Sequence, residues 1–123
     1  MQLCPCDSGK PLSTCCGPLV DGSTSAPTAE RLMRSRYTAF TLGDADYLLH
    51  TWHPDTRPRT IDLDERRRWT GLEIIGVTGG GMLHTEGTVE FVAHYRDGRK
   101  SGSQRENSAF SRVDGRWVYR GEV

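Results

Sequence analysis

The sequence predicts an α+β fold in which helices come first and an antiparallel sheet follows. Apolar residues recur at helical spacing between residues 28 and 54. From Leu72 onward, apolar and polar residues alternate as they do along strands. In addition, all four cysteines lie within the first sixteen residues. We therefore expect a small N-terminal module attached to a single α+β domain.

Composition limits the classes of function. A chain of 123 residues suits one domain with a small appendage. The 16 basic and 16 acidic residues balance, so nothing indicates sequence-independent nucleic-acid binding. No apolar run is long enough to cross a membrane, and the first residues lack the basic and apolar regions of a signal peptide. We expect a cytoplasmic protein, either a monomer or a homodimer.

The cysteines form the most informative pattern in the chain. Cys4, Cys6, Cys15 and Cys16 are spaced as C-x-C, eight residues and C-C. Thiolates are soft ligands, and four of them suit tetrahedral Zn²⁺. Because a segment this short cannot bury a hydrophobic core, metal binding would supply its folding free energy. Four protein ligands leave no position for water, which predicts one structural zinc ion and not a catalytic one.

Three other interpretations of the cysteines stay open. Two disulfides are one, since four cysteines allow three pairings, although thiols stay reduced in the cytosol. A redox dithiol is another, but the C-x-x-C spacing is absent. Incidental cysteines are the third.

The predicted helices follow a linker at residues 21–27 that is rich in Gly, Ser, Thr and Pro. Thr28 is the expected N-cap of a helix that ends near Gly43 and carries the apolar stripe Leu32, Met33, Tyr37 and Phe40.

Two further helices are expected after Gly43. Asp44 is the expected N-cap of the next helix, which Pro54 stops. Residues 62–69 place acidic side chains before basic ones, which matches the helix macrodipole and predicts a short third helix.

Four strands account for the rest of the chain. Two of the connections carry hairpin-turn signals, Asp97-Gly98 and Asp114-Gly115. The predicted strands are Leu72–Thr78, Glu86–Tyr95, Ser103–Val113 and Trp117–Arg120.

A family resemblance adds to these patterns. The run from Cys4 to Gly17 resembles the SEC-C motif, a zinc module also found at the C-terminus of the SecA translocation ATPase; that motif usually has glycine where this chain has Asp7. Residues 34–40, 44–48, 51–54 and 115–119 resemble the YchJ-like family of bacterial proteins. The resemblance implies a SEC-C module at residues 1–20 and a nuclear-transport-factor-2-like domain at residues 28–123, with a curved sheet wrapped round helices. It implies no established activity.

The inner face of such a sheet can enclose a pocket. We expect Glu106 to pair either with buried Arg36 or, for acid–base chemistry, with His53 or His94. A structural role is the more common one for such histidines, and the tryptophans suit a core. The candidate pocket residues are Arg36, Tyr37, Trp52, His53, Trp69, Glu73, His94, Glu106 and Ser108.

Two functions compete at this point. The first is a protein-interaction module linked to translation, secretion or quality control, since the similar module of SecA contacts proteins and ribosomes. The second is a pocket that binds or weakly transforms a small apolar ligand. No P-loop or H-E-x-x-H motif is present. We expect a binding protein with an unidentified protein partner, rather than an enzyme.

Overall fold

The computed structural model describes residues 2–123. The sheet is antiparallel, with its four strands in chain order, and the predicted α+β fold is confirmed. The elements are η1 (Leu12–Thr14), α1 (Gly17–Val20), α2 (Ala29–Leu42), α3 (Ala45–His50), β1 (Arg67–Gly79), β2 (Glu86–Asp97), β3 (Lys100–Val113) and β4 (Arg116–Glu122).

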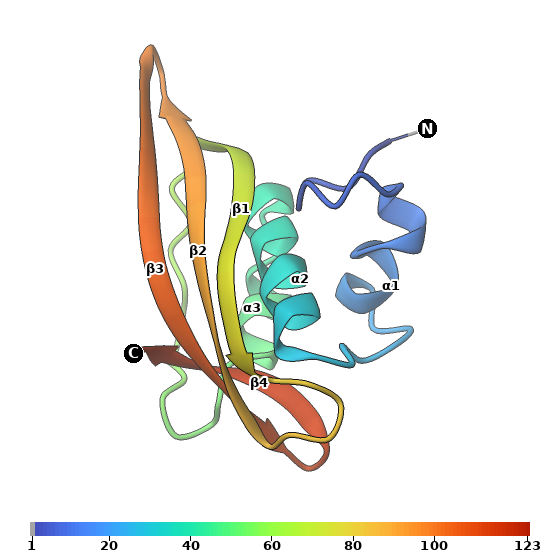
Figure 1. The fold of residues 1–123 in the computed structure, drawn as a ribbon. Coiled ribbons are helices and arrows are strands. Elements are labelled where there is room, and N and C mark those ends of the chain that lie inside the picture. The colour runs from blue at the N-terminus through green and yellow to red at the C-terminus, as the bar shows by residue number, and fades with distance from the viewer. Residues whose placement is uncertain (1) are drawn as a thin grey trace.

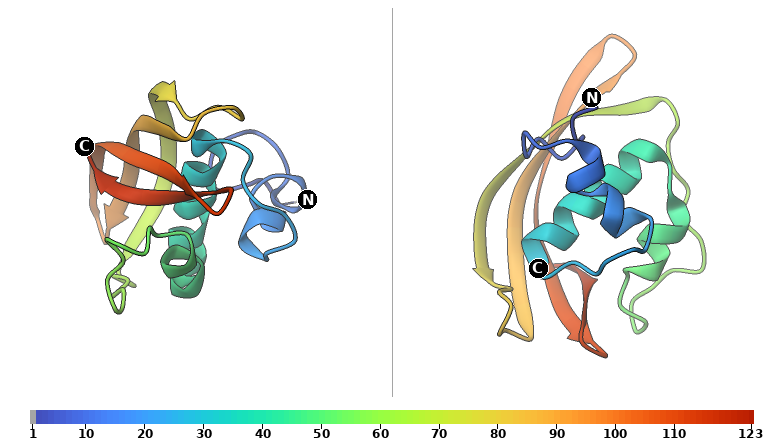
Figure 2. Two further views of the ribbon diagram at one scale, coloured as in Figure 1. Left: turned by 90° about the horizontal axis from the view of Figure 1, so that it is seen from below. Right: turned by 90° about the vertical axis from the view of Figure 1, so that its right-hand side faces the viewer.

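The molecule has a layered arrangement. The curved sheet lies on one side of α2 and α3, and the cysteine-bearing segment folds back onto the other side of α2 (Figure 1). Figure 2 shows the N-terminal segment crossing the helices on the face away from the sheet. No helix in the described part of the chain is long and apolar enough to span a membrane.

Helix α2 is the central element and begins and ends as the sequence predicts. The Thr28 hydroxyl accepts a hydrogen bond from the backbone N–H of Arg31 at 3.2 Å, which satisfies a free donor of the first turn. Gly43 ends the helix in the left-handed region, at φ 74°. Eight residues along α2 are buried, and they include polar as well as apolar side chains, because both sides of the helix are covered.

The predicted cap of α3 is also confirmed, but the helix ends earlier than Pro54 predicts. The Asp44 carboxylate accepts from the first turn at 3.0 Å. The helix ends at His50, before Pro54 is reached. The chain turns there because the backbone N–H of Tyr119 in β4 donates to the carbonyl of Thr51 at 2.7 Å. Pairing with the sheet therefore fixes the end of α3.

The third helix predicted at residues 62–69 is wrong, because β1 already begins at Arg67. The Arg67 guanidinium binds the Asp97 carboxylate across the strands through two hydrogen bonds of 3.1 and 2.9 Å. The Trp69 ring packs edge-on against Tyr95, with centroids 5.7 Å apart. The basic residue Arg67 therefore serves cross-strand pairing here and not a helix macrodipole.

The four predicted strands all lie within observed ones, and β1 is longer than expected. Register shifts interrupt β1 between Trp69 and Gly71 and again between Ile74 and Gly76. Such bulges increase local twist and bend the strand, which matches the curvature seen in Figure 2. The concave face packs on α2 through a core that includes Leu32, Met33, Tyr37, Leu72, Val89, Phe91, Phe110 and Trp117.

Two glycines of the sheet are expected to differ sharply in their tolerance of a methyl group. A Cβ at Gly87 would lie 2.4 Å from the backbone nitrogen of Gly80, which cannot move away cheaply. We predict that Gly87→Ala lowers the free energy of unfolding by about 2 kcal/mol or more. Gly76 has no atom within 4 Å of such a Cβ, so Gly76→Ala should change stability by less than about 0.5 kcal/mol. Urea unfolding of both variants checks this, and equal stabilities would contradict it.

Candidate metal centre and cone pocket

A short hairpin-like loop brings the two pairs of cysteines together. The backbone N–H of Cys4 donates to the carbonyl of Lys10 at 2.9 Å, and Leu3 pairs with Pro11 in an antiparallel bridge. Helix α1 then starts directly after the second pair, at Gly17. A Cβ at Gly17 would lie 2.7 Å from the carbonyl oxygen of Leu12 in η1, so only glycine allows this close return of the chain.

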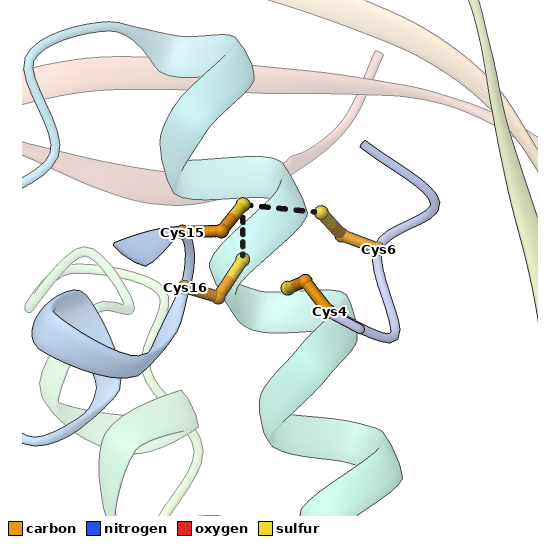
Figure 3. A group of neighbouring side chains, drawn as sticks. All are labelled: Cys4, Cys6, Cys15 and Cys16. Atoms are coloured by element: carbon orange, nitrogen blue, oxygen red, sulfur yellow. Dashed lines mark hydrogen bonds between the residues drawn. The ribbon is translucent and has the colours of Figure 1, made fainter. Parts of the chain in front are cut away.

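The four thiols are buried and point toward one another (Figure 3). All four sulfur atoms lie within 4.8 Å of one another. The Sγ atoms of Cys6 and Cys15 are 3.6 Å apart, and those of Cys15 and Cys16 are 4.0 Å apart. A tetrahedral zinc–thiolate site with bonds of ~2.3 Å has sulfur–sulfur edges of ~3.8 Å. The cysteines are free rather than paired in disulfides, and the cluster can hold a metal ion.

Hydroxyl groups contact two of the sulfur atoms. Ser8 Oγ lies 3.1 Å from the Sγ of Cys15. Thr38 Oγ1, which belongs to α2, lies 3.6 Å from the Sγ of Cys4. Hydrogen bonds of this kind orient metal ligands and tune their basicity.

Two arginines of α2 bind the backbone of the cysteine loop. Arg34 donates to the carbonyl of Cys6 at 2.8 Å and to the carboxylate of Glu30 at 3.1 Å. Arg31 donates to the carbonyl of Cys15 at 3.3 Å. Helix α2 therefore contacts both halves of the cysteine cluster and fixes their relative position.

The environment lowers the pKa of one thiol and raises the pKa of two others. Hydrogen bonding from Cys16, helped by Ser8, lowers the pKa of Cys6 to about 4 against the opposing effect of burial. Hydrogen bonding to the Cys6 thiolate, together with burial, raises the pKa of Cys16. Burial raises the pKa of Cys15. A metal ion bound by all four sulfur atoms must therefore displace protons, so its affinity falls as the pH falls.

Asp7 links the cysteine loop to the sheet. Its backbone lies in the left-handed region at φ 63°, where the SEC-C motif usually has glycine. Its carboxylate oxygen Oδ2 accepts a hydrogen bond from the backbone N–H of Leu72 in β1 at 2.9 Å. A Cβ at Gly71 would lie only 3.2 Å from that oxygen, so the glycine beside the β1 bulge leaves room for the contact. Sequence spacing carries no signal for this tether.

A second candidate site is a cavity of about 260 Å³ between α2 and the concave face of the sheet, called the cone pocket below. Six of the nine predicted pocket residues line it: Arg36, Tyr37, Trp52, Trp69, Glu106 and Ser108. Sequence reasoning missed Gln104 and Tyr119, although Gln104 shares the strand periodicity of Glu106 and Ser108. The other lining residues are Met33, Phe40, Phe91, Ala93 and Phe110.

The three remaining predicted residues lie elsewhere. His94 Nε2 is 2.7 Å from Glu73 Oε1 in an exposed pair, and the ring of His53 accepts from the backbone of Asp55 at 3.0 Å. Neither histidine pairs with Glu106, so the expected acid–base pairing is wrong.

The sheet register explains why His94 cannot reach the pocket. Residues directly opposite each other across a ladder share a face, and successive residues alternate. Glu106 is opposite Phe91, which lines the pocket, whereas His94 is opposite Ser103. The side chains of His94 and Glu106 therefore lie on opposite faces of the sheet.

Arg36 is buried, at 5% exposure, but its expected pairing with Glu106 is wrong. Its NH1 atom donates to the carbonyl of Leu48 and to the hydroxyl of Thr51, both at 2.7 Å. Its guanidinium carbon lies 4.5 Å from the ring centroid of Tyr119, so aromatic faces supply part of the stabilisation that a carboxylate would give. Burial lowers the pKa of Arg36 to about 10, so it remains a cation at neutral pH.

Comparison with known proteins agrees with this geometry. A family model described as "YchJ, middle NTF2-like domain" matches residues 28–121. A UPF0225 protein of Streptomyces coelicolor is 56% identical over 116 residues, which cover 94% of this chain and 90% of the relative. A UPF0225 protein of Corynebacterium efficiens is 49% identical, with 94% and 88% covered.

Two solved structures share the fold. The solution structure of a SEC-C motif containing protein from Rhodopseudomonas palustris matches with a TM-score of 0.86 at 38% identity, covering 98% of this chain and 96% of that one. A crystal structure of a SEC-C motif containing protein from Psychrobacter arcticus matches with a TM-score of 0.79 at 25% identity, covering 98% and 80%.

Asp7 provides a test of how the cysteine loop is attached. We predict that Asp7→Ala lowers the free energy of unfolding by about 1–3 kcal/mol, because alanine disfavours the left-handed backbone and cannot accept from Leu72. Asp7→Asn should cost less than about 1 kcal/mol, since asparagine tolerates this backbone and keeps an acceptor. Urea unfolding of the metal-loaded protein measures both. An alanine variant as stable as the parent would show that the tether contributes nothing.

Proposed function

Since the chain belongs to the YchJ-like family, also called UPF0225, we propose that it is a zinc-stabilised binding protein whose SEC-C module contacts other proteins. The observation that carries this proposal is the cluster of four buried thiols with mutual spacings that suit a tetrahedral ion. Four protein ligands complete the coordination sphere, so the ion has a structural role. The protein contact would serve translation, secretion or quality control, as the likeness to the SecA module suggests.

Zinc is the metal that this donor set favours. Four thiolates in tetrahedral arrangement select zinc or iron among the biological metals. Zinc has no redox chemistry and is the usual ion of closed Cys4 sites that stabilise small modules. The ion would hold the two cysteine pairs together and so keep the loop between them in a fixed shape.

The outer surface of the module is the proposed contact region. Leu3 is 61% exposed, and Lys10 is exposed close by, since the backbone of Cys4 pairs with that of Lys10. The apolar side chain offers contact area, and the cation beside it would attract an acidic protein or ribosomal surface. Because α2 covers the opposite side of the thiols, this side is left for a partner.

The cone pocket supports a second candidate function, the binding of a small molecule. Its walls are mainly aromatic and aliphatic, with a few polar side chains, which is the usual composition of ligand sites. This function does not involve the metal directly. It is independent of the protein contact, and both can hold.

Native mass spectrometry of protein purified without added metal tests the zinc site. We predict one zinc ion per chain, because the four sulfur atoms lie close enough together to bind one tetrahedral ion. Cys6→Ser should lose the ion and lower the melting temperature, whereas Thr14→Ala, an exposed change in the same module, should do neither. Iron in place of zinc, or a metal-free parent protein, would contradict the assignment. A retained small molecule in the same spectrum would support the second function.

Sedimentation with purified bacterial ribosomes tests the contact surface. We predict that Leu3→Asp combined with Lys10→Glu lowers the bound fraction at least severalfold, because both apolar contact and charge attraction are lost. Leu83→Asp is the control, since Leu83 is 97% exposed but lies in the β1–β2 loop outside the module. The double variant must retain its zinc ion for the comparison. Equal binding by parent and double variant would overturn this contact surface, and no binding by the parent would remove ribosomes as the partner.

A further inference from the structure

The structure points to a ligand class for the cone pocket. We propose that the pocket binds a small, flat organic carboxylate that also carries a hydrogen-bond donor. The proposal rests on the second candidate function above and names the chemistry that the pocket selects. It uses three features of the lining: apolar walls, a buried cation, and polar acceptors on one strand.

The walls set the size and shape of the ligand. The cavity of about 260 Å³ lies just below the ~300 Å³ at which pockets for drug-sized molecules begin. Phe91 and Phe110 of the sheet and Met33 of α2 provide the apolar surface. Aromatic and aliphatic side chains favour stacking against a flat ring. One substituted ring is therefore the size that fits.

Arg36 supplies the site for the carboxylate. Its side chain lines the cavity, and only its NH1 atom donates to the protein, to Leu48 and Thr51. Within residues 2–123, no carboxylate lies within the 4.0 Å of an ion pair with Arg36. A buried guanidinium without a counter-ion is costly, and its Nε and NH2 edge matches a carboxylate in bidentate geometry. An anionic ligand would supply the missing charge.

Strand β3 supplies polar acceptors. Gln104, Glu106 and Ser108 alternate along the strand and all line the cavity. The Glu106 carboxylate accepts a hydrogen bond from the Gln104 amide and still has further acceptor capacity. A ligand hydroxyl or amine would donate to it, whereas a ligand carboxylate would be repelled. Arg36 would bind the carboxylate of the ligand and Glu106 its donor, so the two side chains would orient it together.

The structural role of Arg36 determines how the proposal must be tested. Because Arg36 binds the carbonyl of Leu48 at the end of α3, replacing it can unfold the protein. The charge of the ligand is therefore varied and the chain is left intact. Trp52 and Trp69 line the cavity, so binding is observable both by tryptophan fluorescence and by amide chemical shifts in NMR spectra.

The probes are 4-hydroxybenzoate, 4-hydroxybenzamide, benzoate and phenol, each titrated into the metal-loaded full chain. We expect 4-hydroxybenzoate to bind about tenfold or more tightly than the amide, which lacks the charge for Arg36, and more tightly than benzoate, which lacks the donor. Glu106→Gln should reduce the preference for 4-hydroxybenzoate over benzoate. Glu90→Gln is the matched control, because Glu90 pairs with Arg105 and does not line the cavity.

The outcomes separate the ligand class from the existence of a binding site. Equal affinity for the acid and the amide, or binding of phenol alone, would overturn the carboxylate assignment while leaving a small-molecule pocket. Shifts confined to residues outside the cavity, or no shifts with all four probes, would overturn the second candidate function as well. Neither result would bear on the zinc module.

Discussion

Burial of helix α2 on two sides is the constraint on which the rest of the structure depends. Toward the cysteine module, the helix presents Arg34 and Thr38, which bind the loop backbone and a thiol sulfur. Toward the sheet, it presents Met33 and Tyr37, which line the cone pocket. One rigid element therefore positions both candidate sites, and a shift of the helix would alter both. The SEC-C module acts here as part of the domain and not as an independent appendage.

Arg36 shows how a small domain accommodates a buried charge without a salt bridge. A carbonyl and a hydroxyl accept from one edge of the guanidinium, and Trp52 and Tyr119 lie near its faces. This arrangement costs less than an unpaired cation but leaves the other edge without a partner among residues 2–123. Arg36 ties α3 to β4 and also places a positive charge in the wall of the cone pocket. A structural residue can therefore determine ligand choice.

The sequence predicted those features that depend on local chemistry. Cysteine spacing located the cluster of candidate metal ligands, and the N-caps Thr28 and Asp44 located both main helices. The failures concern pairings set by strand register. The charge order of residues 62–69 mimics a helix because the partner of Arg67, Asp97, is thirty residues away in the sequence. Likewise, which residue of β2 lies opposite Glu106 depends on strand pairing that no local pattern reveals.

The dependence of the cysteine cluster on α2 has a consequence during synthesis of the chain. The four thiols leave the ribosome first, whereas the helix that covers them follows later, and β4, whose Tyr119 packs on Arg36, comes last. Until α2 has formed, the thiols are open to oxidants, which react with the thiolate form of cysteine. Early capture of a metal ion would protect the nascent chain from oxidation before its own fold can do so.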